Sequence, residues 1–187
     1  MSDPEHELVE RLRQGDRRAF DELYRQHEER IWRFLVRLSG RRDDAADLFQ
    51  ETWIQAARHA HRLEPGSRLA PWLYTIARNA HRSARRFLLF DFRKRDALAL
   101  EPREGPSTPE TEAETRRLAR RADEALGALT EAHREVLLLA VVEGLSHGEI
   151  ATVLGVREDA VRKRLSRARA ELAAALEKRE ATRGAGA

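Results

Sequence analysis

The uneven distribution of aromatic side chains is the feature that most constrains the fold of this 187-residue chain. All of its aromatic residues lie between Phe20 and Phe92, whereas the apolar residues of the C-terminal half are mostly leucine, valine, isoleucine and alanine. One continuous core rarely segregates in this way, so we expect two small cores. We expect the boundary in residues 101–114, EPREGPSTPETEAE, because this composition buries little surface and need not fold.

The composition favours helices and excludes several classes of protein. Charged residues make up 36% of the chain and aromatic residues only 6%, beside much alanine, leucine, arginine and glutamate. The chain has no cysteine, which excludes disulfides, zinc ribbons, iron–sulfur clusters and thiol catalysis. No apolar run approaches the ~18 residues of a membrane span. The acidic start MSDPEHELVE is unlike a signal or transit peptide, so we expect a cytoplasmic protein without membrane association.

Periodic apolar residues predict a helical bundle in the N-terminal half. Asp16 is the expected cap of a helix that ends at Gly40, and Asp43 or Asp44 is the expected cap of the next helix. A third helix is expected near residues 70–88, with Pro71 in its first turn. A shorter helix is expected at residues 5–13.

The same periodicity predicts which side chains of this bundle face inward. In the helix that follows Asp44 these are Phe49, Trp53, Ile54 and Ala57. In the helix near residues 70–88 they are Trp72, Leu73, Ile76 and Ala80, with Tyr74 also in the core.

The C-terminal half predicts a helix-turn-helix. Helices are expected at residues 113–127 and 131–142, the second capped by Thr130. Ser146 and Glu149 have the spacing of a capping box and open a helix at 147–154. Gly155 then makes a tight turn into a helix over about 158–178. Residues 160–170 hold five basic and no acidic side chains, the charge that a helix bound to phosphates requires.

The same segments resemble a known family. SHGEIATVLGV followed by AVRKRLSRAR is similar to the C-terminal DNA-binding domain of bacterial sigma factors. DAADLFQETWIQAARHAHRL resembles the sigma segment that binds the polymerase core, and APWLYTIARNAHRSARR resembles the segment that opens and recognises the minus-ten promoter element. Three motifs in the correct order, and only two domains, are typical of the extracytoplasmic-function branch of the sigma-70 family.

The resemblance assigns polymerase binding to the helix that contains DLFQE. Asp47, Gln50 and Glu51 lie at i, i+3 and i+4 and therefore share one helix face, which by pattern alone can be an ordinary solvated surface. The resemblance identifies the partner of this face as the coiled coil of the polymerase β′ subunit, with the β flap as a second polymerase contact. The candidate core-binding residues are Asp44, Asp47, Leu48, Gln50 and Glu51.

The third helix and the loop before it are the candidate site for the minus-ten element. Its arginines follow helical spacing and can line up along phosphates, and Asn79 can bond adenine at two positions. The resemblance identifies the loop over residues 62–69 with the one that captures an unpaired base. Ser83 stands where many relatives have an aspartate, so the role of that acid is not transferred. The candidate residues are Arg68, Arg78, Asn79, Arg82, Arg85 and Arg86.

The second helix of the helix-turn-helix is the candidate site for the minus-thirty-five element. Arg162 and Lys163 are the expected contacts at base edges, and Arg167 is better placed for phosphate. One of the two acids, Glu158 or Asp159, is expected only to stabilise the helix, because a negative charge suits its positive N-terminal end. The other can accept a hydrogen bond from cytosine. The candidate residues are Arg157, Glu158, Asp159, Arg162, Lys163, Arg164 and Arg167.

We therefore expect an all-α protein with two small helical domains joined by a flexible linker. The expected domains are residues 1–90 and 115–180, with a linker at 91–114 and a disordered tail at 181–187. The expected function is to direct core RNA polymerase to promoter DNA and to promote opening of the duplex, without a cofactor, a metal or enzymatic activity. The apolar segment 87–92 either extends the third helix and packs on the first domain or is covered by a partner such as an anti-sigma factor. The alternatives are a helix-turn-helix regulator and a sigma-like decoy.

Overall fold

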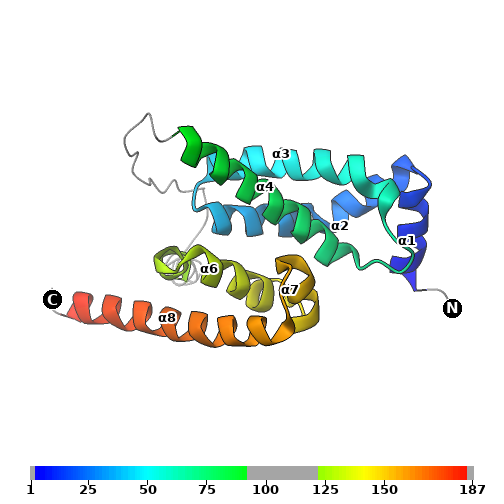
Figure 1. The fold of residues 1–187 in the computed structure, drawn as a ribbon. Helices are drawn as coiled ribbons and strands as arrows, with labels where there is room; N and C mark the ends of the chain where they lie inside the picture. Colours follow the sequence, from blue (N-terminus) through cyan, green and yellow to red (C-terminus); the bar gives the residue numbers. More distant parts are fainter. Residues whose placement is uncertain (1–2, 92–121, 185–187) are drawn as a thin grey trace, which may run out of the picture. The chain divides into compact units, whose positions relative to one another are not determined.

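The computed structural model describes residues 3–91 and 122–184, and every regular element in these two ranges is a helix. The chain divides into two compact units, which confirms the all-α class with two small helical domains. From residue 92 on, the predicted linker lies outside the described residues. None of the described helices is both long and apolar enough to cross a membrane. The first unit is built on α1 (Pro4–Arg13), α2 (Arg17–Ser39), α3 (Arg42–His59), η1 (Ala60–Arg62) and α4 (Leu69–Asp91) (Figure 1).

The core of the first unit lies where α2, α3 and α4 pack against one another. Trp53 of α3 is buried, and its ring centroid lies 4.7 Å from that of Tyr24 and 6.0 Å from that of Phe20, both on α2. Phe34 of α2 packs edge to face on Tyr74 of α4, with centroids 5.1 Å apart. Such aromatic pairs contribute about 0.5–1.5 kcal/mol beyond the burial of their area. The aromatic residues of the N-terminal half therefore hold the three long helices together.

Capping residues fix the ends of α2, whereas the predicted cap of α3 is wrong. The Asp16 side chain accepts a backbone N–H of the first turn of α2 at 2.9 Å, and Gly40 ends this helix with a φ of 74°, both as predicted. Asp43 and Asp44 do not cap α3, because the helix already begins at Arg42 and both acids lie in its first turn. Acidic side chains in the first turn still stabilise α3, because the N-terminal end of a helix carries a partial positive charge.

The inward face of α3 also differs from the expected one. Trp53 is buried and Phe49 half-buried, but Ile54 and Ala57 face outward, and the prediction that they lie inward is wrong. The buried stripe of this helix runs through residues at steps of three and four, so Ile54 lies on the opposite side. In α4, Leu73 and Tyr74 are fully buried, whereas Trp72, Ile76 and Ala80 are half-buried. The buried residues of α3 are Ala45, Leu48, Thr52, Trp53 and Ala56.

The second unit contains the predicted helix-turn-helix. The Glu149 carboxylate accepts the Ser146 N–H at 2.9 Å and the Ser146 hydroxyl accepts the Glu149 N–H at 3.3 Å, which confirms the capping box. Gly155 has a φ of 65° at the predicted turn. The expected helix at 113–127 is described only from residue 122 on. The elements of this C-terminal part of the chain are a helical stretch at residues 122–128, α6 (Glu131–Leu137), η2 (Leu138–Val142), α7 (His147–Leu154) and α8 (Glu158–Gly184).

The helix predicted over 131–142 is α-helical only in its first part. Its last five residues form the π-helical turn η2, where the Glu143 N–H bonds the Leu138 carbonyl at 3.0 Å, five residues earlier. Thr130 occupies the N-cap position, but its side chain makes no capping bond, so that prediction is wrong. Its backbone N–H instead bonds the carboxylate of Glu171 on α8 at 3.1 Å. A residue 41 positions away in the sequence satisfies this N–H.

Gly144 and Gly127 provide a matched pair of tests in the second unit. Gly144 has a φ of 69°, whereas Gly127 lies in a helical stretch without a positive φ, and a Cβ at either position meets open space. Gly144→Ala should therefore destabilise the unit by about 1–2 kcal/mol through backbone strain. Gly127→Ala should be neutral or stabilising by up to about 1 kcal/mol. Chemical denaturation followed by helical circular dichroism measures both, and equal effects would contradict this explanation.

Candidate functional site

The outward face of α3 is acidic and polar. Asp47, Gln50 and Glu51 are all exposed, so the structure brings these three candidates together on one surface as their spacing predicted. Glu51 accepts a hydrogen bond from Gln55 at 2.6 Å, within the same helix. Asp44 is half-buried and forms an ion pair of 3.7 Å with Arg41 at the start of α3. This face therefore presents carboxylate and amide groups to a partner that approaches α3 from outside the bundle.

Leu48 is buried and Ile54 is exposed, whereas the sequence suggested Leu48 as a contact residue and Ile54 as a core residue. Leu48, a candidate polymerase contact, is only 6% exposed, so its side chain packs inside the bundle and supports the α3 surface from below. Ile54 is 37% exposed and lies one turn beyond Gln50 on the outward face. An apolar side chain inside a polar surface is typical of the buried centre of a protein interface. The sequence pattern placed Ile54 inward, and only the packing of α3 shows that it lies opposite the buried stripe.

The outward face of α4 is basic. Asn79, Arg82 and Arg86 are exposed at steps of three and four, on the side opposite the buried residues Leu73 and Ala77. The remaining two candidates on this helix flank the same face, with Arg85 exposed and Arg78 half-buried. No acidic side chain lies on α4 between its start and Asp91. The helix therefore offers a one-sign surface that suits a polyanion.

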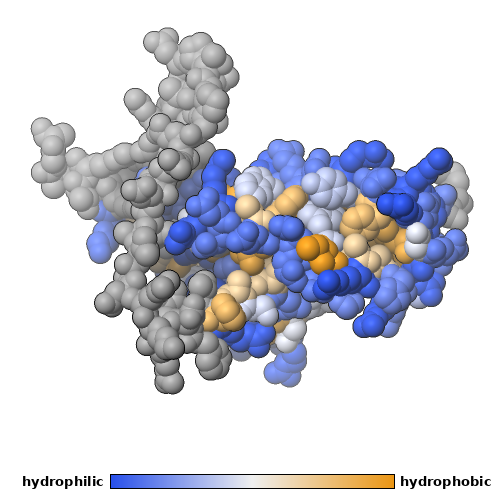
Figure 2. Space-filling model, turned by 90° about the horizontal axis from the view of Figure 1, so that it is seen from above, coloured by the Kyte–Doolittle hydropathy of each residue, from blue (hydrophilic) through white to orange (hydrophobic). Residues whose placement is uncertain are grey.

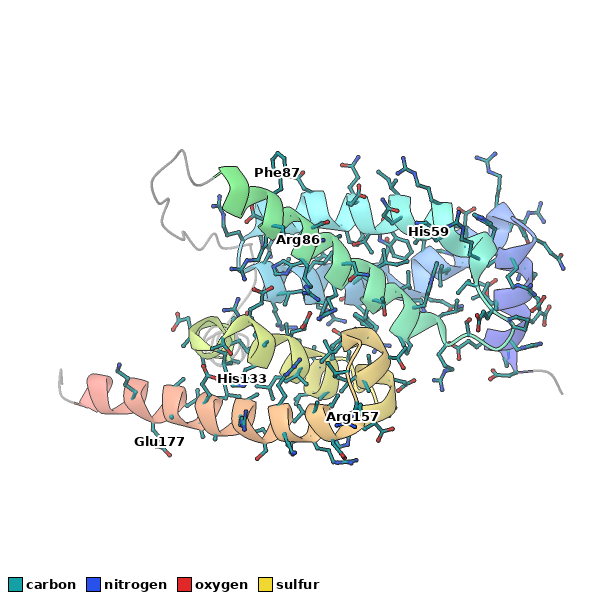
Figure 3. All side chains as sticks on the ribbon, viewed as in Figure 1. His59, Arg86, Phe87, His133, Arg157 and Glu177 are labelled. Atoms are coloured by element: carbon teal, nitrogen blue, oxygen red, sulfur yellow. The ribbon has the colours of Figure 1, made fainter. Side chains whose placement is uncertain are left out.

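Ser83 lies next to one of these arginines. The Arg86 guanidinium donates a hydrogen bond of 3.4 Å to the Ser83 hydroxyl, three residues earlier. A serine neutralises no charge, so the α4 surface keeps the full positive charge of Arg86. Figure 3 labels Arg86 and Phe87 in the last turns of α4, where Phe87 projects from the ribbon with 72% of its surface exposed.

The loop before α4 is tied to the N-terminal helix. Arg68 is exposed, and its Nε atom lies 2.9 Å from Oε2 of Glu5 on α1. The other carboxylate oxygen of Glu5 accepts the Leu69 N–H at 2.8 Å. The sequence predicted Arg68 as a phosphate contact but gave no sign of this acidic partner, because 63 residues separate the two positions in the chain. The structure thus joins α1 to the candidate base-capturing loop.

The outward face of α8 is basic beyond its first turn. Val161, Leu165 and Ala168 are buried, which places Lys163 and Arg167 on the opposite side of the helix. Arg157, Glu158, Asp159 and Arg162 are also exposed, whereas Arg164 is half-buried at the flank. Figure 3 labels Arg157 at the start of α8. The exposed candidates therefore share the solvent side of the helix, and Arg164 is the least accessible of them.

The two acids at the start of α8 are paired within the helix. Arg162 forms ion pairs with Asp159 and, at 3.6 Å, with Glu158. Exposed pairs of this kind are worth up to about 1 kcal/mol and exchange easily with other partners. The acids therefore hold Arg162 over the first turn of α8 while leaving it able to move to a ligand.

A cluster between α6 and α8 positions the basic helix. His133 of α6 bonds the carboxylate of Glu171, which also accepts the Thr130 N–H. The hydrogen bond from His133 is the main reason why the pKa of Glu171 lies below its ordinary value, and the bond from the Thr130 N–H adds to this effect. Figure 3 shows His133 on α6, beside α8. The ionised Glu171 thereby joins the N-terminus of α6 to the middle of α8.

Few large apolar side chains are exposed in the described parts of the chain. Figure 2 shows one face of the molecule, on which hydrophilic side chains surround smaller apolar areas. Within residues 3–91 and 122–184, no group of three or more His, Cys, Asp or Glu side chains is placed to hold a metal ion. The large apolar side chains that are exposed in these ranges are Ile54, Phe87, Val141, Val142 and Leu176.

Two family models match the two parts of the chain that the structure describes. The family model of sigma-70 region 2 matches residues 23–87, which include α3 and most of α4, and that of sigma-70 region 4 matches residues 119–172. The RNA polymerase sigma factor CarQ of Myxococcus xanthus is 38% identical over 85% of this chain and 90% of its own length. The ECF RNA polymerase sigma factor SigL of Mycobacterium tuberculosis is 35% identical over 76% of this chain and 80% of its own length.

The chain belongs to the ECF subfamily of the sigma-70 family. Its fold agrees with that of a solved relative, the sigma factor RpoE in a complex with the anti-sigma factor NepR from Bartonella quintana. The TM-score is 0.70 at 26% identity, over 84% of this chain and 96% of that one. As a sigma factor, the protein directs RNA polymerase to promoters. Its acidic α3 surface lies in the part matched by region 2, and its basic α8 surface begins in the part matched by region 4.

Proposed function

We propose that this sigma factor divides its work among three surfaces, each on a different helix. The outward face of α3 binds the polymerase core, the face of α4 with the loop before it binds the minus-ten element, and the face of α8 binds the minus-thirty-five element. The observation that carries this proposal is the separation of charge: α3 is acidic on its outward face, whereas α4 and α8 are basic. The protein works by binding alone, and the reaction is that of the polymerase.

The α3 surface suits a basic helical partner, such as the β′ coiled coil. Asp47 and Glu51 supply charge that steers the encounter and fixes its orientation. Ile54 supplies an apolar centre that loses its water on binding, where truncation usually costs most. Leu48 contributes by keeping α3 packed on the bundle rather than by direct contact.

The α4 surface suits DNA that is partly single-stranded. Arg82, Arg86 and the flanking arginines follow phosphates, and Asn79 bonds the edge of an upstream base. The sigma factor promotes opening by binding extruded bases, so the binding energy compensates for their lost stacking. Tyr74 takes no part in stacking, because it is fully buried against Phe34.

The α8 surface suits the major groove of duplex DNA. Lys163 and Arg167 lie farthest from the buried stripe of the helix, and Arg162 flanks them. Arg162 exchanges Asp159 for a base edge or phosphate, which leaves the Asp159 carboxylate available to accept a hydrogen bond from cytosine. One helix then uses both signs of charge for specificity.

A regulator without polymerase binding, or a decoy, would not require all three surfaces together. A decoy needs no exposed basic faces on α4 and α8, and a duplex-binding regulator needs no acidic face on α3. An anti-sigma factor is a further proposed partner, supported by the NepR complex of the solved relative and by the exposed Phe87 at the end of α4.

Replacing two residues of the α3 surface tests core binding. Asp47→Ala with Gln50→Ala removes one charge and one amide from the outward face without touching the buried stripe, so the fold should stay intact. Affinity for core polymerase should fall at least about tenfold, as expected for residues central to an interface. The control, Asp21→Ala with Gln26→Ala, removes the same residue types from exposed positions on α2. Core affinity that is equal in both double variants would refute the assignment of α3.

Replacing two residues of the α8 surface tests promoter recognition separately. Arg162→Ala with Lys163→Ala should weaken promoter-dependent transcription by about tenfold or more, because each base contact is worth about 1–3 kcal/mol. Core binding should remain, since α3 is unchanged. The control, Arg17→Ala with Lys178→Ala, removes one arginine and one lysine outside the proposed contacts. Full activity of the α8 variant on its promoter would show that this helix does not recognise the minus-thirty-five element.

A further inference from the structure

Glu5 of α1 makes two polar contacts with a part of the chain that is distant in the sequence. One carboxylate oxygen accepts the backbone N–H of Leu69, the first residue of α4, at 2.8 Å. The other lies 2.9 Å from Nε of Arg68, the last residue of the loop before α4. Glu5 thus acts as a cap for α4 from another helix, and it pairs with the arginine beside that cap. Figure 1 shows α1 at the end of the bundle where the connection from α3 to α4 passes.

Arg68 is the main cationic partner of this carboxylate. His27 of α2 is a second basic side chain close enough to interact electrostatically with Glu5. Burial, together with the charge of Arg30, lowers the pKa of His27, which favours the neutral form of its imidazole. The Glu5 carboxylate therefore acts mainly on Arg68 and on the Leu69 N–H at the start of α4, where a helix favours an anion.

The loop that Glu5 contacts is short and held at both ends. Leu63 and Leu69 are buried, and the residues between them are largely exposed. Gly66 has a φ of 77°, and the Ser67 N–H bonds the Glu64 carbonyl at 3.0 Å, which folds the loop into a turn. The ion pair with Glu5 restricts the Arg68 side chain at the end of this turn, since the side chain is 66% exposed and has much rotamer freedom to lose.

We propose that Glu5 is a positioning residue for the minus-ten element: from α1, it holds Arg68 and the first turn of α4 in the geometry that binds the melted strand. This inference rests on the proposed function of the loop, and it extends the DNA-binding apparatus to a helix that makes no DNA contact itself. Because the loop is ordered before DNA arrives, less conformational entropy is lost on binding. The N-terminal helix thereby contributes to promoter opening.

The test separates the ion pair from the cap. Glu5→Gln keeps an amide oxygen for the Leu69 N–H but removes the negative charge that faces Arg68, whereas Glu5→Ala removes both. The assay measures binding of the complex of this chain with core polymerase to a single-stranded oligonucleotide that carries the minus-ten element of a transcribed promoter. Glu5→Gln should weaken binding about twofold to fivefold, the range expected for an exposed ion pair, and Glu5→Ala should weaken it further. Glu7→Gln, an exposed acid on the same helix, should have no effect.

A double variant shows whether Glu5 acts through Arg68. Arg68→Ala alone should weaken oligonucleotide binding, and adding Glu5→Gln should weaken it no further, while affinity for core polymerase stays unchanged throughout. An equal loss from Glu5→Gln with and without Arg68, or a loss of core affinity, would mean that Glu5 only stabilises the fold and would overturn the proposal. If Arg68→Ala weakens binding and Glu5→Gln does not, the positioning role is refuted while the loop assignment stands. If Arg68→Ala has no effect, both the loop assignment and this inference fail.

Discussion

The burial of one apolar stripe on each of α3, α4 and α8 determines which side chains of these helices face solvent. A helix that packs against its neighbours through residues three and four apart can present only the opposite side to solvent. On α3 that side holds acids and an amide, and on α4 and α8 it holds arginines and a lysine. The packing of Trp53, Tyr74 and Val161 therefore decides which charged side chains of each helix face outward. On each of these helices, the core residues and the charged surface residues lie on opposite sides.

Carboxylates that act over long sequence distances complete this arrangement. Glu5 joins α1 to the start of α4, and Glu171 joins α8 to the start of α6. In both cases an acid satisfies a backbone N–H at the beginning of another helix, where the helix dipole favours negative charge. Each contact lies beside a surface proposed to bind DNA. The helices proposed to bind DNA are thus positioned by polar contacts as well as by apolar packing.

Periodic spacing and local capping were predictable from the sequence, because they depend on neighbours within one or two turns. The cap of α2 by Asp16, its end at Gly40 and the capping box of α7 are such cases, and all three are confirmed. The cap of α3, the side on which Ile54 lies and the change to a π-helical turn after Leu137 were not predicted. These depend on how whole helices meet. The partners of Arg68 and Thr130 were missed for the same reason.

This chain gives RNA polymerase its choice of promoter. The most direct test mixes the purified chain with bacterial core polymerase and a library of randomised promoters, and then sequences the transcripts. We expect defined start sites that require the added chain, preceded by two short shared elements separated by a constant distance. Transcripts that are the same with and without the folded chain would contradict this role.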